Sequence, residues 1–138
     1  MSIDEIRERR EQLVRHHMRV ENDGDADAVV QTFHRPHYDL VAPSVVFDGA
    51  DAVRRRVQML AEAMPDARVE ATHIHHSDSA VIVETTTTGT HTGNLMDIAP
   101  NGRPFEIRGV AIFLFEEDRL VGERVYYDRQ TLLDQIKE

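Results

Sequence analysis

The sequence predicts an α+β fold in which N-terminal helices cover one face of a curved antiparallel sheet. Apolar residues recur at helical spacing through much of the first half of the chain. After Ala67 the chain alternates or is rich in β-branched residues, as a meander of long strands would be. Helices followed by such a meander are typical of an α+β plan. A strongly curved sheet closed by helices makes a cone, and a cone can hold a small molecule at its open end.

Length and composition limit the classes of protein this chain can belong to. With 138 residues it has the size of one domain, so we expect residues 1–138 to form a single domain. Its 25 acidic and 16 basic side chains give a formal charge of −9, which disfavours nucleic acid and anionic membranes as partners. The chain has no cysteine, which excludes disulfides and thiolate chemistry. It shows neither a signal peptide nor a membrane span, so we expect a cytoplasmic protein.

Two helices are predicted at the start of the chain. Residues 3–21 place apolar side chains at helical intervals. Gly24 then supplies a stop, and Asp25 supplies an N-cap for a short second helix over residues 26–33. Pro36 ends that helix, because its ring does not fit a helical continuation.

An extended segment and a third helix follow. Residues 37–47 are extended in character, and Pro43 confines them to an edge or a bend. The third helix opens at residues 48–51 and closes at Pro65. It carries Arg54, Arg55 and Arg56 in succession, which we interpret as a solvated helix face in an acidic chain and not as a nucleic-acid patch.

The second half is predicted to be almost entirely strand. Residues 68–75 and 80–90 form two strands, and residues 94–102 form a loop. A long hairpin occupies residues 103–127, and a last helix begins after Asp128, whose carboxylate can cap it.

The register of the hairpin decides the candidate site. We expect a three-residue loop at residues 117–119, with Asp118 in the left-handed conformation. The predicted pairs are then Phe115 with Val121, Phe113 with Glu123, Ala111 with Val125, and Gly109 with Tyr127. This register points Glu123 into an apolar face of the sheet, whereas a slip of one residue would turn it to solvent.

Three segments of the second half match a known pattern. They are Gly89-Thr90-His91-Thr92-Gly93, the approach Asn101-Gly102-Arg103-Pro104, and the ending from Tyr126 to Gln135. Together with the order of elements they make the chain resemble the nuclear transport factor 2-like superfamily, and within it the SnoaL-like polyketide cyclase (ester cyclase) branch. The resemblance spans roughly residues 47–136 and implies the cone-shaped fold. It implies less about activity, because the superfamily includes cyclases, isomerases, dehydratases, epoxide hydrolases and binding domains.

The positions that carry acid/base chemistry in the polyketide cyclases differ here. In that family an Asp on the last strand, three residues before the Asp of the terminal motif, moves the proton during ring closure. This chain has Val125 at that position. A supporting His of the family corresponds to Glu123, and another corresponds to Ala111. The resemblance therefore implies the fold without the cyclase's own acid/base groups.

Glu123 is the strongest catalytic candidate. A carboxylic acid beside Phe113, Val125 and Tyr127 is poorly solvated, which raises its pKa toward the range useful for proton transfer. His91 is either a general base or donor to a substrate, or a residue at the pocket rim satisfied by backbone.

The remaining candidates have structural alternatives. Tyr127 and Tyr38 can donate their hydroxyl groups to an oxyanion or simply pack in the core. His73, His75 and His76 invite a metal site. Only His73 and His75 share a strand face, and no third ligand joins them there, so we expect no metal. The residues expected to contact a ligand are Tyr38, Phe113, Ala111, Val125 and His73.

The leading hypothesis is a cofactor-independent enzyme that transfers protons on an apolar, carbonyl-bearing small molecule, by isomerisation, cyclisation, hydration or dehydration. Glu123 would be the acid or base, with His91 and Tyr127 orienting the substrate or stabilising an enolate. The alternative is a non-catalytic domain that binds a hydrophobic ligand, which the loss of the cyclase's acid/base groups favours. The other face of the hairpin carries Val110, Ile112 and Leu114, too apolar for water, so we also expect a homodimer.

Overall fold

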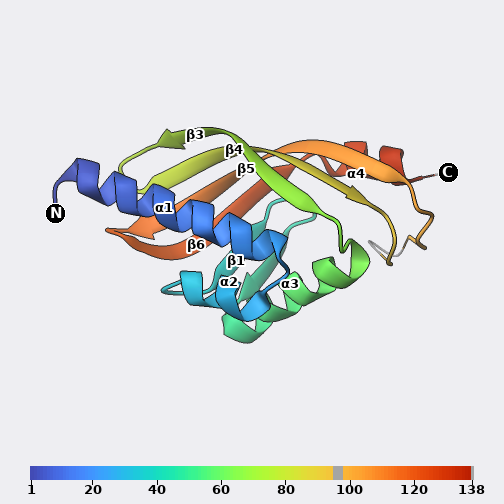
Figure 1. The fold of residues 1–138 in the computed structure, drawn as a ribbon, viewed down its shortest axis with the longest axis horizontal. Coiled ribbons are helices and arrows are strands. Elements are labelled where there is room, and N and C mark those ends of the chain that lie inside the picture. The colour runs from blue at the N-terminus through green and yellow to red at the C-terminus, as the bar shows by residue number, and fades with distance from the viewer. Residues whose placement is uncertain (95–97, 138) are drawn as a thin grey trace.

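The computed structural model describes residues 1–94 and 98–137 and has the predicted α+β architecture (Figure 1). The described residues form four helices and six strands, in the predicted order. They are α1 (Ile3–Asn22), α2 (Ala26–Thr32), β1 (His37–Leu40), β2 (Val45–Asp48), α3 (Ala50–Ala63), β3 (Arg68–His76), β4 (Ala80–Thr90), β5 (Pro104–Glu116), β6 (Arg119–Tyr127) and α4 (Arg129–Ile136). Part of the loop predicted over 94–102 lies outside the described residues. None of the helices in the described ranges is long and apolar enough to cross a membrane.

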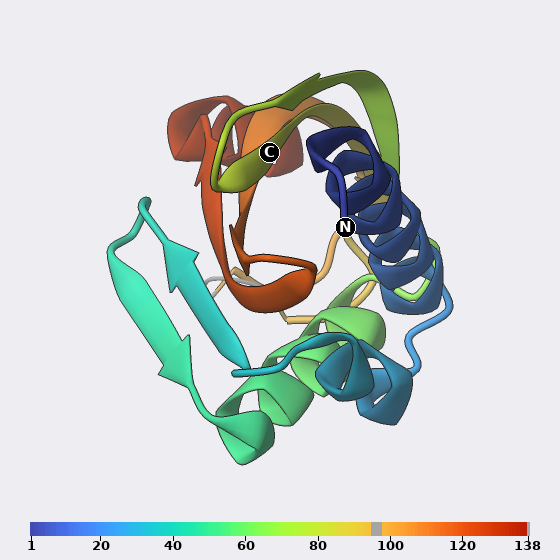
Figure 2. The same cartoon turned by 90° about the vertical axis from the view of Figure 1, so that its left-hand side faces the viewer.

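The strands form one curved sheet in the order β2-β1-β6-β5-β4-β3. The long strands pair antiparallel with their neighbours in sequence, whereas β1 pairs parallel with β6. The segment predicted as one extended stretch is thus two short strands, and Pro43 lies in the turn between them. In the end view the sheet curves around the interior, with α1 along one side and α2 and α3 below the hairpin (Figure 2).

Side-chain caps account for three of the helix starts. The backbone N–H of Glu5 donates to Ser2 Oγ at the start of α1. Asp25 accepts from Ala28 at the start of α2, as predicted. Asp128 accepts from the backbone of Thr131 at the start of α4, which confirms the structural interpretation of that carboxylate.

The β5–β6 hairpin keeps the predicted register by a different route. Its loop has two residues, and Glu117 rather than Asp118 takes the left-handed conformation, with φ 54°. The shorter loop pairs Phe115 with Leu120, which corrects the predicted Phe115–Val121 pair. The register shifts by one residue after this pair, so all pairs from Gly122 onward are those predicted. Glu123 therefore pairs with Phe113 and faces inward.

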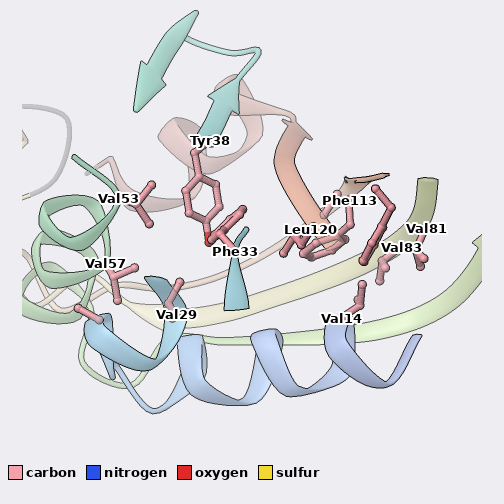
Figure 3. Close-up of a cluster of buried hydrophobic side chains, with 13 residues drawn as sticks. Val14, Val29, Phe33, Tyr38, Val53, Val57, Val81, Val83, Phe113 and Leu120 are labelled. Atoms are coloured by element: carbon pink, nitrogen blue, oxygen red, sulfur yellow. The ribbon is translucent and has the colours of Figure 1, made fainter. Parts of the chain in front are cut away.

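The interior holds two hydrophobic clusters. The first core cluster lies between α1, α2, α3 and the middle of the sheet, and Figure 3 shows side chains from all of them meeting there. Its members include Val14, Val29, Phe33, Tyr38, Val53, Val57, Val81, Val83, Phe113 and Leu120. The second core cluster joins the end of α3, the start of β5 and α4, through Ala63, Met64, Phe105, Ile107, Leu132 and Ile136. A cavity lies between these two clusters.

Candidate functional site

A cavity of about 610 Å³ lies between the inner face of the sheet and α3. Its volume is in the range of small-molecule sites. Most of its wall is apolar and comes from both clusters, including Val57, Leu60, Met64, Phe105, Ile107, Ala111, Val125 and Leu132. Polar groups interrupt this wall beside the first core cluster, where Glu21, Arg56 and Glu123 reach it, and Tyr127, which packs against the second core cluster, reaches it as well. An apolar chamber with a few charged groups on one side suits an apolar ligand with one reacting polar group.

Glu123 lies at the boundary between the cavity and the first core cluster. Its side chain is 5% exposed, and the register places it between Phe113 on β5 and Tyr38 on β1. Its Oε1 atom lies 2.9 Å from Nε2 of His17 on α1. A buried carboxylate therefore has a cationic partner on one side and the cavity on the other.

His17 is fully buried, and its Nδ1 atom carries a hydrogen. Nδ1 lies 2.7 Å from the hydroxyl oxygen of Thr32. That hydroxyl already donates its own hydrogen to the carbonyl oxygen of Val29, at 2.6 Å. The Thr32 oxygen can therefore only accept from the ring, so the hydrogen between them belongs to Nδ1.

The other ring nitrogen of His17 faces three oxygens. Nε2 lies 2.9 Å from Glu123 Oε1, 3.2 Å from Glu21 Oε2 and 2.9 Å from the Tyr38 hydroxyl. Burial raises the pKa of Tyr38 well above its ordinary value, so the hydroxyl keeps its hydrogen and donates it to Glu21 at 2.5 Å. Because the atoms around Nε2 are hydrogen-bond acceptors, Nε2 carries a hydrogen as well. With hydrogens on both ring nitrogens, His17 is an imidazolium cation.

The pKa shifts agree with this arrangement. Burial opposes the charge on His17, but the neighbouring Glu123 and Glu21 outweigh it and raise the pKa of His17 to about 9. Burial likewise opposes the charge on Glu21, but His17 and Arg56 outweigh it and lower the pKa of Glu21 to about 2. For Glu123 burial is the stronger effect and raises the pKa, despite His17. Two neighbouring carboxylates are thus separated into a permanent anion and a group suited to accept a proton.

These shifts predict how stability depends on pH. The contribution of His17 is present below its ordinary pKa of 6.5 and is lost as the pH rises toward about 9. The contribution of Glu21 is present above its ordinary pKa of 4.5 and is lost as the pH falls toward about 2. The raised pKa of Glu123 also lowers stability as the pH rises past 4.5. We therefore expect the free energy of unfolding to be highest between about pH 4.5 and 6.5.

Urea unfolding across a pH series would measure this profile. Each group changes the free energy by at most about 1.4 kcal/mol per pH unit. A His16→Leu variant, which removes an exposed neighbour on the same helix, is the control and should keep the decline above pH 6.5. A profile that stays flat from pH 6.5 to 9 would contradict the assignment of His17 as a buried cation.

Arg56 is a cation in the cavity wall, and its position corrects the interpretation of the three arginines. Arg54 pairs with Asp27 and Asp51, and Arg55 is exposed, as a solvated face requires. Arg56 instead is 9% exposed, and its guanidinium carbon lies 4.2 Å from the centre of the Tyr38 ring. Consecutive helical residues point about 100° apart, so three in a row cannot all share one face.

The network also has the donor spacing of a metal site. His17 Nε2 and one carboxylate oxygen each of Glu21 and Glu123 all lie within 4.8 Å of one another. Two features favour an ion-pair network over a metal centre. Nε2 carries a hydrogen that metal ligation would displace, and Arg56 already adds a second positive charge beside the carboxylates.

The structure brings together only part of the predicted ligand-contacting set. Ala111, Val125 and Tyr127 line the cavity beside Glu123, and burial raises the pKa of Tyr127. Tyr38 and Phe113 are corrected to core residues, because they belong to the first core cluster behind Glu123 and do not reach the cavity wall.

Both predicted histidines lie outside the cavity, which corrects their expected placement. His91 is fully buried in the 91–103 connection, where its Nε2 donates to the carbonyl oxygen of Ile98 at 3.1 Å. Its backbone N–H donates to Arg103, so this residue shapes a loop. His73 is on the outer face of β3, 67% exposed, next to His75 and Glu84. A register shift between Ala71 and His73 interrupts the alternation of β3, so His73 faces outward although Ala71, two residues before it, packs against the core.

Sequence reasoning missed His17, Glu21 and Arg56. A signal for the first two was present, because Arg10, Val14, His17 and Glu21 follow one another at intervals of four, three and four along α1. Such spacing marks one helix face, and Val14 at its centre is fully buried. Arg56 similarly stands between Val53 and Val57, both buried. A charged residue on an apolar stripe is the pattern that identifies each of them.

Comparisons with known proteins agree with this architecture. The model of a family described as SnoaL-like polyketide cyclase matches residues 11–136. The structure of TsrD from Streptomyces laurentii is similar with a TM-score of 0.81 and 23% identity, covering 94% of this chain and 96% of that one. A protein with a ketosteroid isomerase-like fold from Catenulispora acidiphila, in complex with trimethylamine, is similar with a TM-score of 0.77 and 14% identity, covering 90% and 91%. At these identities the two structures show the fold alone. No curated protein matches the chain.

Proposed function

The chain belongs to the SnoaL-like polyketide cyclase family, and from this premise we propose that it is an enzyme that moves a proton at the carbon next to a carbonyl group. Its substrate is an apolar small molecule. The observation that carries the proposal is the buried carboxylate of Glu123 in the wall of an apolar cavity, beside the His17 cation. A carboxylate with a raised pKa is a suitable base for such a proton.

Glu123 takes the proton in this mechanism, and the electrons of the carbon–hydrogen bond pass to the carbonyl oxygen as an enolate. Return of the proton to another carbon gives isomerisation. Attack of the enolate on a second carbonyl forms a carbon–carbon bond, and the oxygen of that carbonyl takes the proton from Glu123, which gives ring closure. Loss of a hydroxyl group from the carbon next to the enolate, with that proton and as water, gives dehydration. His17 is a positioning residue, because it lies 2.9 Å from one oxygen of Glu123 and its charge opposes the rise that burial causes in the pKa of Glu123.

One observation favours a second candidate, a non-catalytic domain that binds an apolar ligand. Two of the three positions that correspond by resemblance to acid/base groups of the polyketide cyclases, Val125 and Ala111, have lost those groups. Both side chains are apolar and line the cavity. A binding domain needs no more than such a wall.

Deuterium exchange from solvent into a bicyclic ketone distinguishes the enzyme from the binding domain. The probe is 2-tetralone in deuterated buffer, with loss of the proton signals next to its carbonyl followed by NMR. We expect the protein to accelerate this exchange over the same buffer without protein. Saturable binding of 2-tetralone with no acceleration of exchange would favour the binding domain and contradict the proposed enzyme.

We also propose that two copies of the chain associate through the outer face of the β5–β6 hairpin. Val110, Ile112 and Leu114 alternate with the inward residues of β5 and remain only partly buried. The helices lie on the inner face, so a second copy would cover this apolar surface.

An Ile112→Lys variant is expected to be monomeric at micromolar concentration, because a charge would be buried in the interface. Sedimentation velocity would measure the mass. Ile3→Lys makes the same change at a position that is 52% exposed on α1 and should leave the mass unchanged. A wild-type protein that is already monomeric at micromolar concentration would contradict the proposal.

A further inference from the structure

We propose that Arg56 binds the carbonyl oxygen of the substrate, and that the substrate is therefore a neutral ketone or 1,3-dicarbonyl compound and not a carboxylic acid. The inference rests on the proposed function, since it concerns the oxygen that gains charge when Glu123 takes the proton. Arg56 would stabilise the carbonyl oxygen while Glu123 takes the proton from the neighbouring carbon, and this pairing limits the class of molecule that can bind.

Arg56 has hydrogen-bond donors without acceptors. Its Nε and Nη1 atoms are buried and have no partner among the residues that the structure describes. The ring of Tyr38 covers a face of the guanidinium, at 4.2 Å. Buried charged groups in proteins are almost always hydrogen-bonded, because loss of hydration without a partner is unfavourable. Since Arg56 lines the cavity, an oxygen of a ligand can supply the missing acceptor.

The position of Arg56 is fixed by packing. Val53 and Val57, on either side of it along α3, belong to the first core cluster. Tyr38 is itself held by its hydrogen bond to Glu21. A donor that is already in place when charge develops needs no reorganisation during the reaction, which is the condition for effective stabilisation of an oxyanion.

The charges of three groups in the cavity wall, and of His17 behind Glu123, select the substrate class. With Glu123 ionised to act as the base, the positive His17 and Arg56 balance the negative Glu21 and Glu123, and the four groups sum to zero. A neutral ligand leaves this balance undisturbed. A carboxylate would bring an uncompensated negative charge into a poorly solvated chamber, close to two existing carboxylates, which is unfavourable.

Proton transfer to Glu123 makes the net charge of the four groups more positive, which favours a negative oxygen on the substrate. The carbon–hydrogen bond next to the carbonyl breaks, and its proton forms an O–H bond on Glu123. The electron pair of the broken bond forms a carbon–carbon double bond, and the carbonyl oxygen becomes negative. The four groups then sum to +1 at the moment when the oxygen beside Arg56 carries −1. Arg56 therefore binds the transition state more strongly than the neutral substrate, which accelerates the reaction.

The test uses 2-naphthol, whose neutral form resembles the enol and whose conjugate base resembles the enolate. The Glu123→Gln variant has a neutral side chain at residue 123, as after proton transfer. We expect 2-naphthol bound to this variant to lose its proton at least one pH unit lower than in water, as measured by absorbance. Adding Arg56→Met should remove this shift. Adding Arg55→Met, the same change at the exposed neighbouring residue, should leave it in place.

Two results would overturn the role of Arg56 or the substrate class, and a replacement variant covers loss of folding. A shift of equal size with and without Arg56 would overturn it. If the Arg56→Met variant does not fold by circular dichroism, Arg56→Lys takes its place; it keeps the charge but not the planar donors, and should give a smaller shift. Wild-type protein should bind 2-naphthol at least tenfold more tightly than 2-naphthoate at neutral pH, and the reverse order would overturn the assignment to neutral carbonyl compounds.

Failure of this inference and failure of the proposed function give different results. The 2-tetralone experiment measures turnover, whereas the 2-naphthol titration measures binding in a variant that lacks the base. If the protein accelerates exchange into 2-tetralone but Arg56 has no effect on bound 2-naphthol, the proposed enzyme stands and the role of Arg56 is wrong. If the shift in 2-naphthol depends on Arg56 but the protein does not accelerate exchange into 2-tetralone, Arg56 binds an oxyanion and the proposed enzyme is wrong.

Discussion

Replacing Glu123 with glutamine is expected to slow deuterium exchange into 2-tetralone by about 10²–10⁴-fold, the usual contribution of a positioned general base. Glutamine has nearly the shape of glutamate and can keep the contact with His17, whose Nε2 lies 2.9 Å from Oε1. Its amide cannot take up a proton at neutral pH, so the loss would reflect chemistry and not a cavity. Exchange rates at equal protein and ketone concentrations, followed by NMR, would measure the effect.

The control for this prediction is Glu84→Gln. It removes a carboxylate that pairs with His75 on the outer face of the sheet, away from the cavity. We expect that variant to exchange at the wild-type rate. Equal rates for wild type and Glu123→Gln would show that another group removes the proton.

Replacing His17 with leucine is expected to lower the free energy of unfolding by about 3–5 kcal/mol, as removal of one partner from a buried ion pair does. The substitution leaves Glu123 and Glu21 close together with Arg56 as the remaining cation of the network. It also removes the ring that donates to Thr32. Urea unfolding at pH 6, where the contribution of His17 is fully present, would measure the loss.

Two further variants show whether charge is the cause. His16→Leu, at an exposed position on the same helix, should change the free energy by less than about 0.5 kcal/mol. The double variant His17→Leu with Glu123→Leu removes both charges and should recover much of the stability, because apolar replacements of a whole buried pair are often neutral. A loss below about 1 kcal/mol for His17→Leu would contradict the buried cation.

The fold and the inward position of Glu123 could be predicted because they depend on alternation along a strand. The predicted loop of the hairpin was wrong by one residue, yet Glu123 still faces inward. The shift of register after the Phe115–Leu120 pair compensates for the shorter loop. A burial requirement on one whole face thus fixes the register more firmly than the turn does.

The partners of Glu123 could not be predicted by the same reasoning. His17 lies more than a hundred residues from it in the chain, and their contact depends on how α1 packs against the sheet. Apolar periodicity places α1 on the sheet, but it does not show which polar residue on the buried face meets which strand. His91 shows the opposite error, because it lies in a matching motif whose local role is to hold a loop.

The two sides of the cavity belong to different hydrophobic clusters. The groups proposed to carry the reaction are therefore separate from the residues that select the shape of the substrate. The charged groups are anchored in the first core cluster, whereas Phe105, Ile107 and Leu132 of the opposite wall belong to the second. Residues of the second cluster can therefore be enlarged or trimmed to admit molecules of another shape, with the proton chemistry unaltered. Divergence among descendants of such a scaffold, and its redesign in the laboratory, would both begin at that opposite wall.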